Sequence, residues 1–290
     1  MVNLHTHCLI CNEINLTELK DFRTAGLVKC QSCGFVFSKY IPTKEELIAH
    51  YNGYGRNDYL SPITIKRYNE LLDHFEKFRK TNNILDVGCG IGYFLEIAKE
   101  RGWNVYGTEF TQEAISICQQ KGIEIREGAL TNQMFEPEQF DIITSFEVLE
   151  HINNPIEELT HFNHFLRKGG LVYLTTPNFN SLLRIKLKEK YDVITYPEHL
   201  SYYTPSTLLK LFKNSGFKKY KIETTGISIS RLKSGKNHAS IAHVSESSDD
   251  EKLRNSFETK FYMKLIKNTI NKGLTIVGLG DSLKGWFIKV

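Results

Sequence analysis

A regular alternation of strand-like and helix-like segments in the middle of the chain constrains its fold more than any other feature. Apolar runs at NILDV (83–87), NVYGTE (104–109) and FDIITSF (140–146) are separated by helical patterns, two of which span 93–101 and 111–120. Strands that alternate with helices form parallel sheets, because each helix supplies the crossover between neighbouring strands. The sequence therefore predicts an α/β protein built on a doubly wound, mostly parallel sheet.

The same patterns predict the remaining elements. Further strands are expected at IEIRE (123–127), LVYLTT (171–176), YKIETTGISI (220–229) and LKGWFIKV (283–290). Amphipathic or capped helices are expected over 61–80, 155–166, 204–216 and 257–270, with Gly169 and Gly170 stopping the second of them. Thr43 and Glu46 form a capping-box pattern for a short helix that breaks near 51–55, and 234–251 is polar enough to be a loop.

Four cysteines near the start of the chain predict a metal site. Cys8, Cys11, Cys30 and Cys33 form two C-x2-C pairs separated by 18 residues. Each pair can present two thiolates from one tight turn, and this spacing is typical of tetrahedral zinc. Four thiolates leave no open coordination position, so we expect a structural Zn²⁺ whose removal unfolds only this module. We place the zinc-binding module at 1–41, a helical linker at 42–80 and the main domain at 81–290.

Bulk composition restricts the function classes. The net charge of +4, from 37 basic and 33 acidic residues, is too mild for a typical nucleic-acid-binding protein. No apolar run reaches the roughly 20 residues that span a bilayer, and the first residues lack signal-peptide order. We therefore expect a cytoplasmic protein with reduced cysteines, for which nucleic acid is an improbable partner. The sequence does not indicate the oligomeric state.

A glycine turn follows the first predicted parallel strand. Asp86 precedes Gly88, Gly90 and Gly92, whereas a nicotinamide-binding turn starts with glycine directly after the strand. Glu109 ends the second strand, where a carboxylate can accept hydrogen bonds from both ribose hydroxyls. The pattern indicates a nucleoside-containing cofactor at the carboxyl edge of the sheet.

ILDVGCGIGYF, VYGTEF and FDIITSFEVLEHI resemble the successive motifs of class I S-adenosylmethionine-dependent methyltransferases over about 81–290. The resemblance implies a seven-stranded Rossmann-like sheet whose last strand is antiparallel. It also implies that Asp86, Gly88, Gly90 and Gly92 line the methionine part of S-adenosyl-L-methionine, that Glu109 holds the ribose, that Phe110 flanks the adenine and that Glu147 supports the cofactor loop. Ala129 and Leu130 replace the usual acidic contact to the adenine amine, so they would reach it through backbone or apolar contacts.

Two histidines are candidates for the acid–base chemistry. Methyl transfer to a hydroxyl requires loss of its proton, and histidine is a suitable base near neutral pH. His151 follows the fourth strand, and His199 lies on the long connection after the fifth. We expect His199 to be the base and His151 to position it. Either histidine could equally be a structural residue, and Glu147 and Glu150 are alternative bases.

The order of motifs is similar to that of bacterial methyltransferases of surface-polysaccharide and sugar-nucleotide pathways, and the front half looks like that of deoxysugar C-methyltransferases. This resemblance implies O-methylation of a sugar hydroxyl, on a small-molecule or glycan acceptor that is free or linked to a nucleotide or lipid. Basic residues at 184–190, Lys210, Lys213, Lys218 and Lys219 could face its phosphate, or could simply form a solvated surface. The alternatives are a quinone or small-phenol O-methyltransferase, a sugar C-methyltransferase, an RNA methyltransferase and a non-catalytic scaffold.

Overall fold

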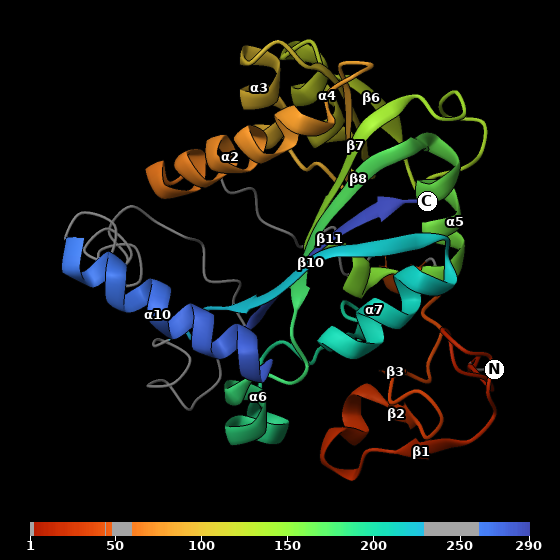
Figure 1. The fold of residues 1–290 in the computed structure, drawn as a ribbon. Helices are drawn as coiled ribbons and strands as arrows, with labels where there is room; N and C mark the ends of the chain where they lie inside the picture. Colours follow the sequence, from red (N-terminus) through yellow and green to blue (C-terminus); the bar gives the residue numbers. More distant parts are fainter. Residues whose placement is uncertain (1–2, 44, 48–59, 229–260) are drawn as a thin grey trace.

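The computed structural model describes residues 3–43, 45–47, 60–228 and 261–290 (Figure 1). Its main sheet has seven strands in the order β10-β11-β8-β7-β4-β5-β6. These strands are β4 (Asn83–Val87), β5 (Asn104–Glu109), β6 (Glu124–Glu127), β7 (Phe140–Phe146), β8 (Leu166–Pro177), β10 (Phe217–Thr225) and β11 (Ser282–Lys289). β4 to β8 pair in parallel, whereas β11 is antiparallel to both β8 and β10. The predicted doubly wound, mostly parallel sheet with an antiparallel last strand is confirmed.

Helices cover both faces of this sheet (Figure 1). One face packs against α2 (Pro62–Phe75), α3 (Tyr93–Glu100) and α4 (Gln112–Gln120), which contribute Phe75, Leu95 and Cys118 to one buried cluster. The other face packs against α5 (Pro155–Phe165) and α7 (Pro205–Asn214), through Phe162 and Leu211 among others. Burial of these apolar faces is the main source of stability for a three-layer arrangement of this kind.

Helix starts follow the caps that the sequence contains. The Thr204 side chain accepts a hydrogen bond from the Thr207 backbone N–H and opens α7, with Pro205 at its first position. The Thr43 and Glu46 capping box is also formed, with distances of 2.8 and 3.2 Å, and Glu45–Leu47 are helical. The rest of that predicted helix lies outside the described residues, as does the predicted loop at 234–251. Along the described chain, no helix is both long and apolar enough to cross a membrane.

One expected helix stop and one expected helix end are wrong. α5 ends at Phe165, and Gly169 and Gly170 lie inside β8 instead of stopping the helix. A Cβ at Gly170 would lie 2.9 Å from the Asp141 carbonyl oxygen, so this glycine permits close approach of β8 to β7. Helix α10 (Phe261–Val277) continues past the expected end at Ile270 and packs along β10.

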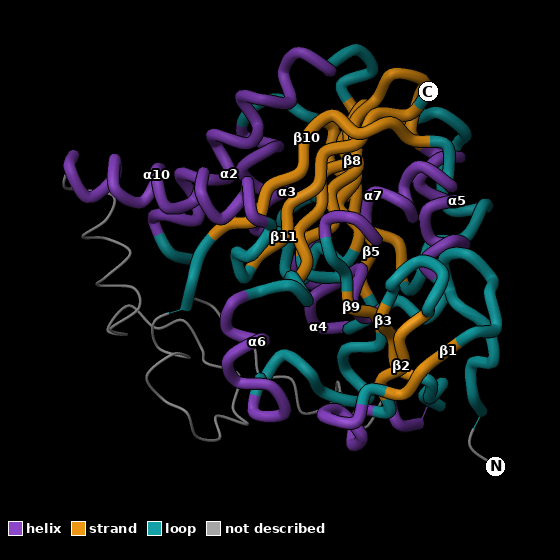
Figure 2. The backbone as a smooth tube through the Cα atoms, turned by 60° about the horizontal axis from the view of Figure 1, so that its bottom comes forward, coloured by secondary structure: helices purple, strands orange, loops and turns teal. Residues whose placement is uncertain are grey.

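The cysteine-rich segment forms a second, four-stranded sheet of order β1-β2-β3-β9 (Figure 2). It consists of β1 (Leu16–Glu18), β2 (Leu27–Cys30), β3 (Val36–Ser38) and β9 (Ser201–Tyr202), with the 3-10 helix η1 (Lys20–Ala25) between β1 and β2. β9 belongs to the connection after β8 and pairs with β3 through Val36 and Tyr202. The N-terminal segment is therefore continuous in structure with the connection that follows β8 in the main domain.

Candidate functional site

The glycine turn after β4 has the backbone geometry that its sequence predicts. Gly88, Gly90 and Gly92 have φ values of 70°, 55° and 78°, which favour glycine. A Cβ at Gly88 would lie 2.6 Å from Val148 Cγ2, and one at Gly92 would lie 2.6 Å from Ile123 Cδ1. Gly90 faces open space, with no heavy atom of the described chain within 4 Å of its Cβ position. The turn thus exposes backbone where a ligand can approach closely.

Asp86 lies buried beneath this turn. Its Oδ1 accepts a hydrogen bond from Thr144 Oγ1 on β7 at 2.7 Å. Burial raises the pKa of the Asp86 carboxyl to about 7, with a smaller contribution from the negative charge of Glu109. A cation near the turn would favour the ionised form of Asp86, so the carboxyl can respond to a positively charged ligand.

Glu109 joins the glycine turn to the end of β5. Its Oε2 accepts a hydrogen bond from the Gly90 backbone N–H at 3.0 Å. Its Oε1 accepts from the N–H groups of Phe110 at 2.8 Å and Thr111 at 3.1 Å. These bonds fix the carboxylate at the sheet edge, and the half-buried side chain keeps lone pairs for a ligand.

The residues expected around the adenine differ in exposure. The Phe110 ring is 66% exposed beside Glu109, and Ala129 is exposed after β6. Leu130 is only 3% exposed and belongs to the apolar cluster that contains Leu85 and Phe135. Leu130 can therefore contact a bound adenine only through its backbone, whereas Phe110 offers its ring face.

The segment after β7 packs directly on the glycine turn through Val148. Glu147 is exposed and has a φ of 52°, and its N–H donates to the Thr175 carbonyl at 2.9 Å. Glu150 is buried and accepts a hydrogen bond from Thr176 Oγ1 at 2.9 Å. Burial, followed by the charge of Glu147, raises the pKa of Glu150 well above its ordinary value. Glu150 therefore favours its neutral form and is a poor base.

The two candidate histidines lie together although 47 residues separate them in sequence. Their ring centroids are 4.8 Å apart, with an interplanar angle of 70°. Nδ1 of His151 donates to the Glu198 carbonyl at 2.8 Å, and Nδ1 of His199 donates to the Val193 carbonyl at 2.6 Å. A carbonyl oxygen can only accept, so each ring carries a proton on Nδ1, and the free base site of either ring in its neutral form is Nε2.

Burial lowers the pKa of His151 to about 4, and the neighbouring His199 adds to this effect. His151 is therefore neutral at physiological pH. Ligand atoms of Glu150, His151 and His199 also lie within 4.8 Å of one another, so this group has the donor set for a divalent cation. The arrangement can hold a hydroxyl and remove its proton.

The four cysteines meet as the spacing predicts. Sulfur atoms of Cys8 and Cys33 are 3.5 Å apart, and those of Cys11 and Cys30 are 3.6 Å apart. Ligands of tetrahedral zinc at roughly 2.3 Å would lie roughly 3.8 Å from one another, so the group fits zinc. Each pair is followed by a left-handed residue, Asn12 or Gly34, whose N–H bonds the first cysteine carbonyl at 2.9 Å. All four thiols are free of disulfides.

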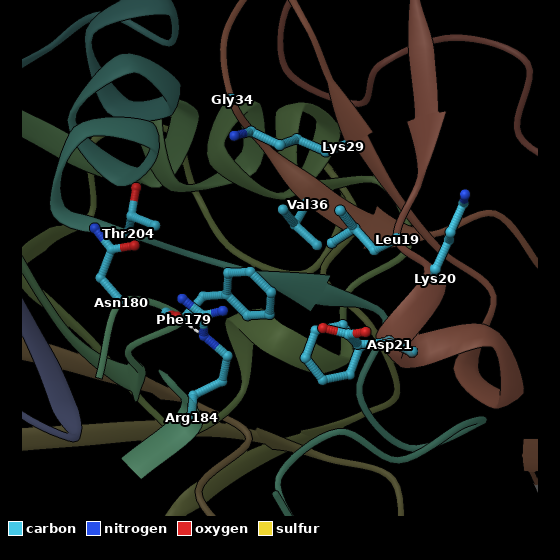
Figure 3. A pocket seen from close by; sticks show the side chains of 11 residues that line it. Leu19, Lys20, Asp21, Lys29, Gly34, Val36, Phe179, Asn180, Arg184 and Thr204 are labelled. Atoms are coloured by element: carbon cyan, nitrogen blue, oxygen red, sulfur yellow. Dashed lines mark hydrogen bonds between the residues drawn. The ribbon is translucent and has the colours of Figure 1, made fainter. Parts of the chain in front are cut away.

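A polar cavity of about 370 Å³ lies between η1, β2 and the segment that follows β8 (Figure 3). Lys20, Lys29, Phe179 and Arg184 are among its lining residues. Sequence reasoning identified Arg184 only as part of a basic run and missed the other three. Nothing in the local sequence links Lys29 with Arg184, because the pairing of β3 with β9 brings their segments together.

Comparisons with known proteins agree with this architecture. A family model described as a methyltransferase domain matches residues 60–222, which is more than half of the chain, so the chain belongs to this methyltransferase-domain family. The crystal structure of a SAM-dependent methyltransferase from Archaeoglobus fulgidus shares the fold, with a TM-score of 0.53 and 20% identity over 84% of this chain and 99% of that one. Phosphoethanolamine N-methyltransferase 2 of Haemonchus contortus, in complex with S-adenosyl-L-methionine, also gives 0.53 at 20% identity, covering 85% of this chain and 57% of that one.

Curated relatives match the central part of the chain. A ubiquinone biosynthesis O-methyltransferase of Aeromonas salmonicida is 28% identical over 146 residues, which are 46% of this chain and 61% of that protein. The protein of the same name from Pseudomonas aeruginosa is 33% identical over 104 residues, covering 33% of this chain and 45% of the relative. The match thus spans less than two thirds of the length of either relative.

Proposed function

We propose that this protein transfers the methyl group of S-adenosylmethionine to a hydroxyl oxygen of a small acceptor. The observation that supports this best is the pairing of the His151 and His199 rings, 4.8 Å apart, where His151 follows Val148, the residue that packs against the glycine turn. The curated relatives are named as O-methyltransferases, which supports the same reaction type.

Residues of the carboxyl sheet edge would hold the cofactor. The Asp86 to Gly92 turn would receive the methionine part, and Glu109 would accept hydrogen bonds from the ribose hydroxyls. Phe110 would cover the adenine, with the Ala129 and Leu130 backbone at its edge and Glu147 supporting the loop. When bound, S-adenosylmethionine supplies a methyl carbon made electrophilic by the sulfonium sulfur.

His199 would act as the base. As the acceptor hydroxyl takes up the methyl group that the cofactor would supply, its proton would pass to Nε2 of His199. The bond from Nδ1 of His199 to the Val193 carbonyl fixes the ring and stabilises the cation that forms. His151, held by the Glu198 carbonyl, would position His199 and exclude water.

Two acceptor classes remain, each supported by a different observation. The relatives' name favours a phenolic acceptor over the sugar that the motif order suggests. The polar cavity with Lys20, Lys29 and Arg184 favours a sugar hydroxyl on a phosphorylated carrier. Methylation assays with a catechol and with a nucleotide sugar would separate these two classes.

We propose that the four cysteines hold a structural zinc ion. Their sulfur separations and paired turns support this assignment, and a complete thiolate set leaves no position for substrate. The ion would hold the two turns together and thereby fix β2 and β3, against which β9 pairs.

Calorimetric titration with S-adenosylhomocysteine tests the cofactor site. Glu109→Ala should weaken binding at least tenfold, because it removes a charged acceptor for the ribose hydroxyls, each such bond being worth about 1.5–3 kcal/mol. Glu100→Ala is the matched control, since Glu100 is exposed at the opposite end of α3 from the glycine turn. Absence of binding by folded wild-type protein would contradict the proposal.

A further inference from the structure

The cavity beside the N-terminal sheet is lined by segments far apart in sequence. Lys29 enters from β2 and Arg184 from α6 (Leu182–Leu187), and the Phe179 ring lies between them (Figure 3). Phe22 adds a second aromatic side chain, and Asn180 adds an amide. At about 370 Å³ the cavity is larger than a single phosphate requires.

Arg184 is fixed in place at the cavity wall. Its Nε donates to the Phe179 carbonyl at 2.6 Å, and its guanidinium carbon lies 4.4 Å from the Phe179 ring centroid. Burial lowers the pKa of Arg184, so the fold makes its charge more costly than in water. The remaining guanidinium N–H groups match the geometry of a phosphate or carboxylate.

The charge around the cavity is unbalanced. Lys20, Lys29 and Arg184 line it together with one carboxylate, Asp21. Within the described ranges, no carboxylate forms an ion pair with any of these three cations. A half-buried guanidinium with lysines beside it and no paired carboxylate favours an anionic ligand.

The cavity is also connected to the proposed base. The Phe179 ring packs against Tyr202 with centroids 5.7 Å apart, and the Tyr202 hydroxyl donates to the His199 carbonyl at 3.0 Å. Phe179 N–H donates to the Tyr203 carbonyl at 2.8 Å, which ties the segment after β8 to β9. Through Phe179 and Tyr202 the cavity wall is therefore in contact with the backbone of the proposed base.

We propose that this cavity binds the diphosphate of a phosphorylated methyl acceptor, with Arg184 and Lys29 holding the phosphoryl oxygens. The inference rests on the proposed methyl transfer for its role, and it names the acceptor class as a diphosphate ester. The Phe179 and Phe22 rings accommodate the adjoining group of the ester. The other basic residues singled out in the sequence, Lys210, Lys213, Lys218 and Lys219, do not line the cavity.

Titration of the full chain with uridine diphosphate, inorganic pyrophosphate and farnesyl diphosphate tests this assignment. We expect saturable binding that weakens with salt. Arg184→Gln should weaken binding at least tenfold and Lys29→Gln about threefold, because charged hydrogen bonds are lost. Tighter binding of uridine diphosphate indicates a nucleotide-linked acceptor, and tighter binding of the farnesyl ester a lipid-linked one.

Lys213→Gln is the matched control, because Lys213 is exposed on α7 away from the cavity. Arg184→Lys, which keeps the charge but loses the planar fork, provides a second variant if Arg184→Gln does not fold. Titration of the same variants with S-adenosylhomocysteine is expected to be unchanged, so failure of the cofactor site and failure of the cavity are distinguishable. The proposal would be overturned if folded wild-type protein bound none of the diphosphates. It would also be overturned if the two single variants, Arg184→Lys and Lys29→Gln, both bound them as tightly as the wild type.

Discussion

The proposed cofactor edge, formed by the glycine turn and Glu109, and the proposed acceptor side, around His151, His199 and β9, are assembled in different ways. At the cofactor edge, the glycine turn and Glu109 come from adjacent strands β4 and β5, and Gly90 N–H bonds the Glu109 carboxylate across 19 residues. On the acceptor side, β3 pairs with β9 across more than 160 residues, and His5 contacts Asn153 at 2.6 Å. The geometry of the cofactor edge is set by residues close in sequence, whereas that of the acceptor side depends on pairing between segments far apart in sequence.

The long-range pairing changes how the N-terminal segment is expected to unfold. Phe35 and Phe37 are fully buried and share a cluster with Tyr203, Leu208 and residues of the main sheet. The Phe35 and Tyr203 rings are 5.2 Å apart. A module whose core continues into the main domain cannot unfold alone without exposing part of that domain, so the sequence-based expectation of a purely local effect needs revision.

Loss of the metal should have the largest effect and should separate the two regions. Substituting Cys8, Cys11, Cys30 and Cys33 by Ser should abolish zinc content and unfold the β1-β2-β3-β9 sheet, because structural zinc binding contributes on the order of 10 kcal/mol. We expect methyl transfer to be lost while binding of S-adenosylhomocysteine is largely kept. Metal analysis, hydrogen exchange of 200–203, a methyl-transfer assay and calorimetry would measure these four effects.

Restoration by added zinc after chelation of the wild type is the control for irreversible damage. If the four-serine variant retains its metal, the zinc assignment is incorrect. If it loses zinc but keeps full protection over 200–203, the proposed dependence of β9 on the metal fails, and the acceptor side is more independent than the pairing suggests.

Removal of the proposed base should have the next largest effect. His199→Ala should lower kcat by about 10²- to 10⁴-fold, the usual contribution of general base catalysis, and leave affinity for S-adenosylhomocysteine unchanged. His151→Ala should have a smaller effect, because His151 acts through His199. His74→Ala, on the exposed surface of α2, is the matched control. Wild-type turnover in His199→Ala would exclude this base.

The contrast also explains how far the sequence predicted the fold. The strands β4, β5, β7 and β11 were predicted because each is a short apolar run bounded by turns, and α7 because Thr204 and Pro205 mark its start. β9 contains two residues and is stabilised by β3, so it has no local signal. Gly169 and Gly170 resemble a helix stop, yet they serve strand packing against Asp141.

The same difference decides which residues of the candidate site could be predicted from the sequence. The glycine turn and Glu109 could be located because their positions after β4 and β5 fix them at one edge. His151 and His199 could be singled out individually, but their 4.8 Å contact depends on the Leu200 N–H bond to the Glu150 carbonyl, which long-range folding creates. The cavity cations could not be grouped, since Lys29 and Arg184 meet only when the N-terminal sheet docks.

A buried carboxyl in neither site, but close enough to Tyr203 to interact with it electrostatically, should give the smallest effect. It would show whether the acceptor side tolerates ionisation. Glu158 on α5 is 6% exposed, and burial raises its pKa to about 7, with a smaller contribution from Glu157. Because the folded-state pKa lies above the unfolded value, the stabilising contribution is present below about pH 4.5 and is lost as pH rises through about 7.

Glu158→Gln keeps the shape of the side chain but cannot ionise. Its free energy of unfolding relative to the wild type should therefore rise by about 1–3 kcal/mol between pH 5 and pH 8, as measured by urea denaturation at fixed zinc concentration. Glu100→Gln, at an exposed position, should show no such change. An equal pH dependence for Glu158→Gln and the wild type would mean that α5 opens enough to hydrate this carboxylate, and that the acceptor side is less tightly packed than its buried aromatic cluster indicates.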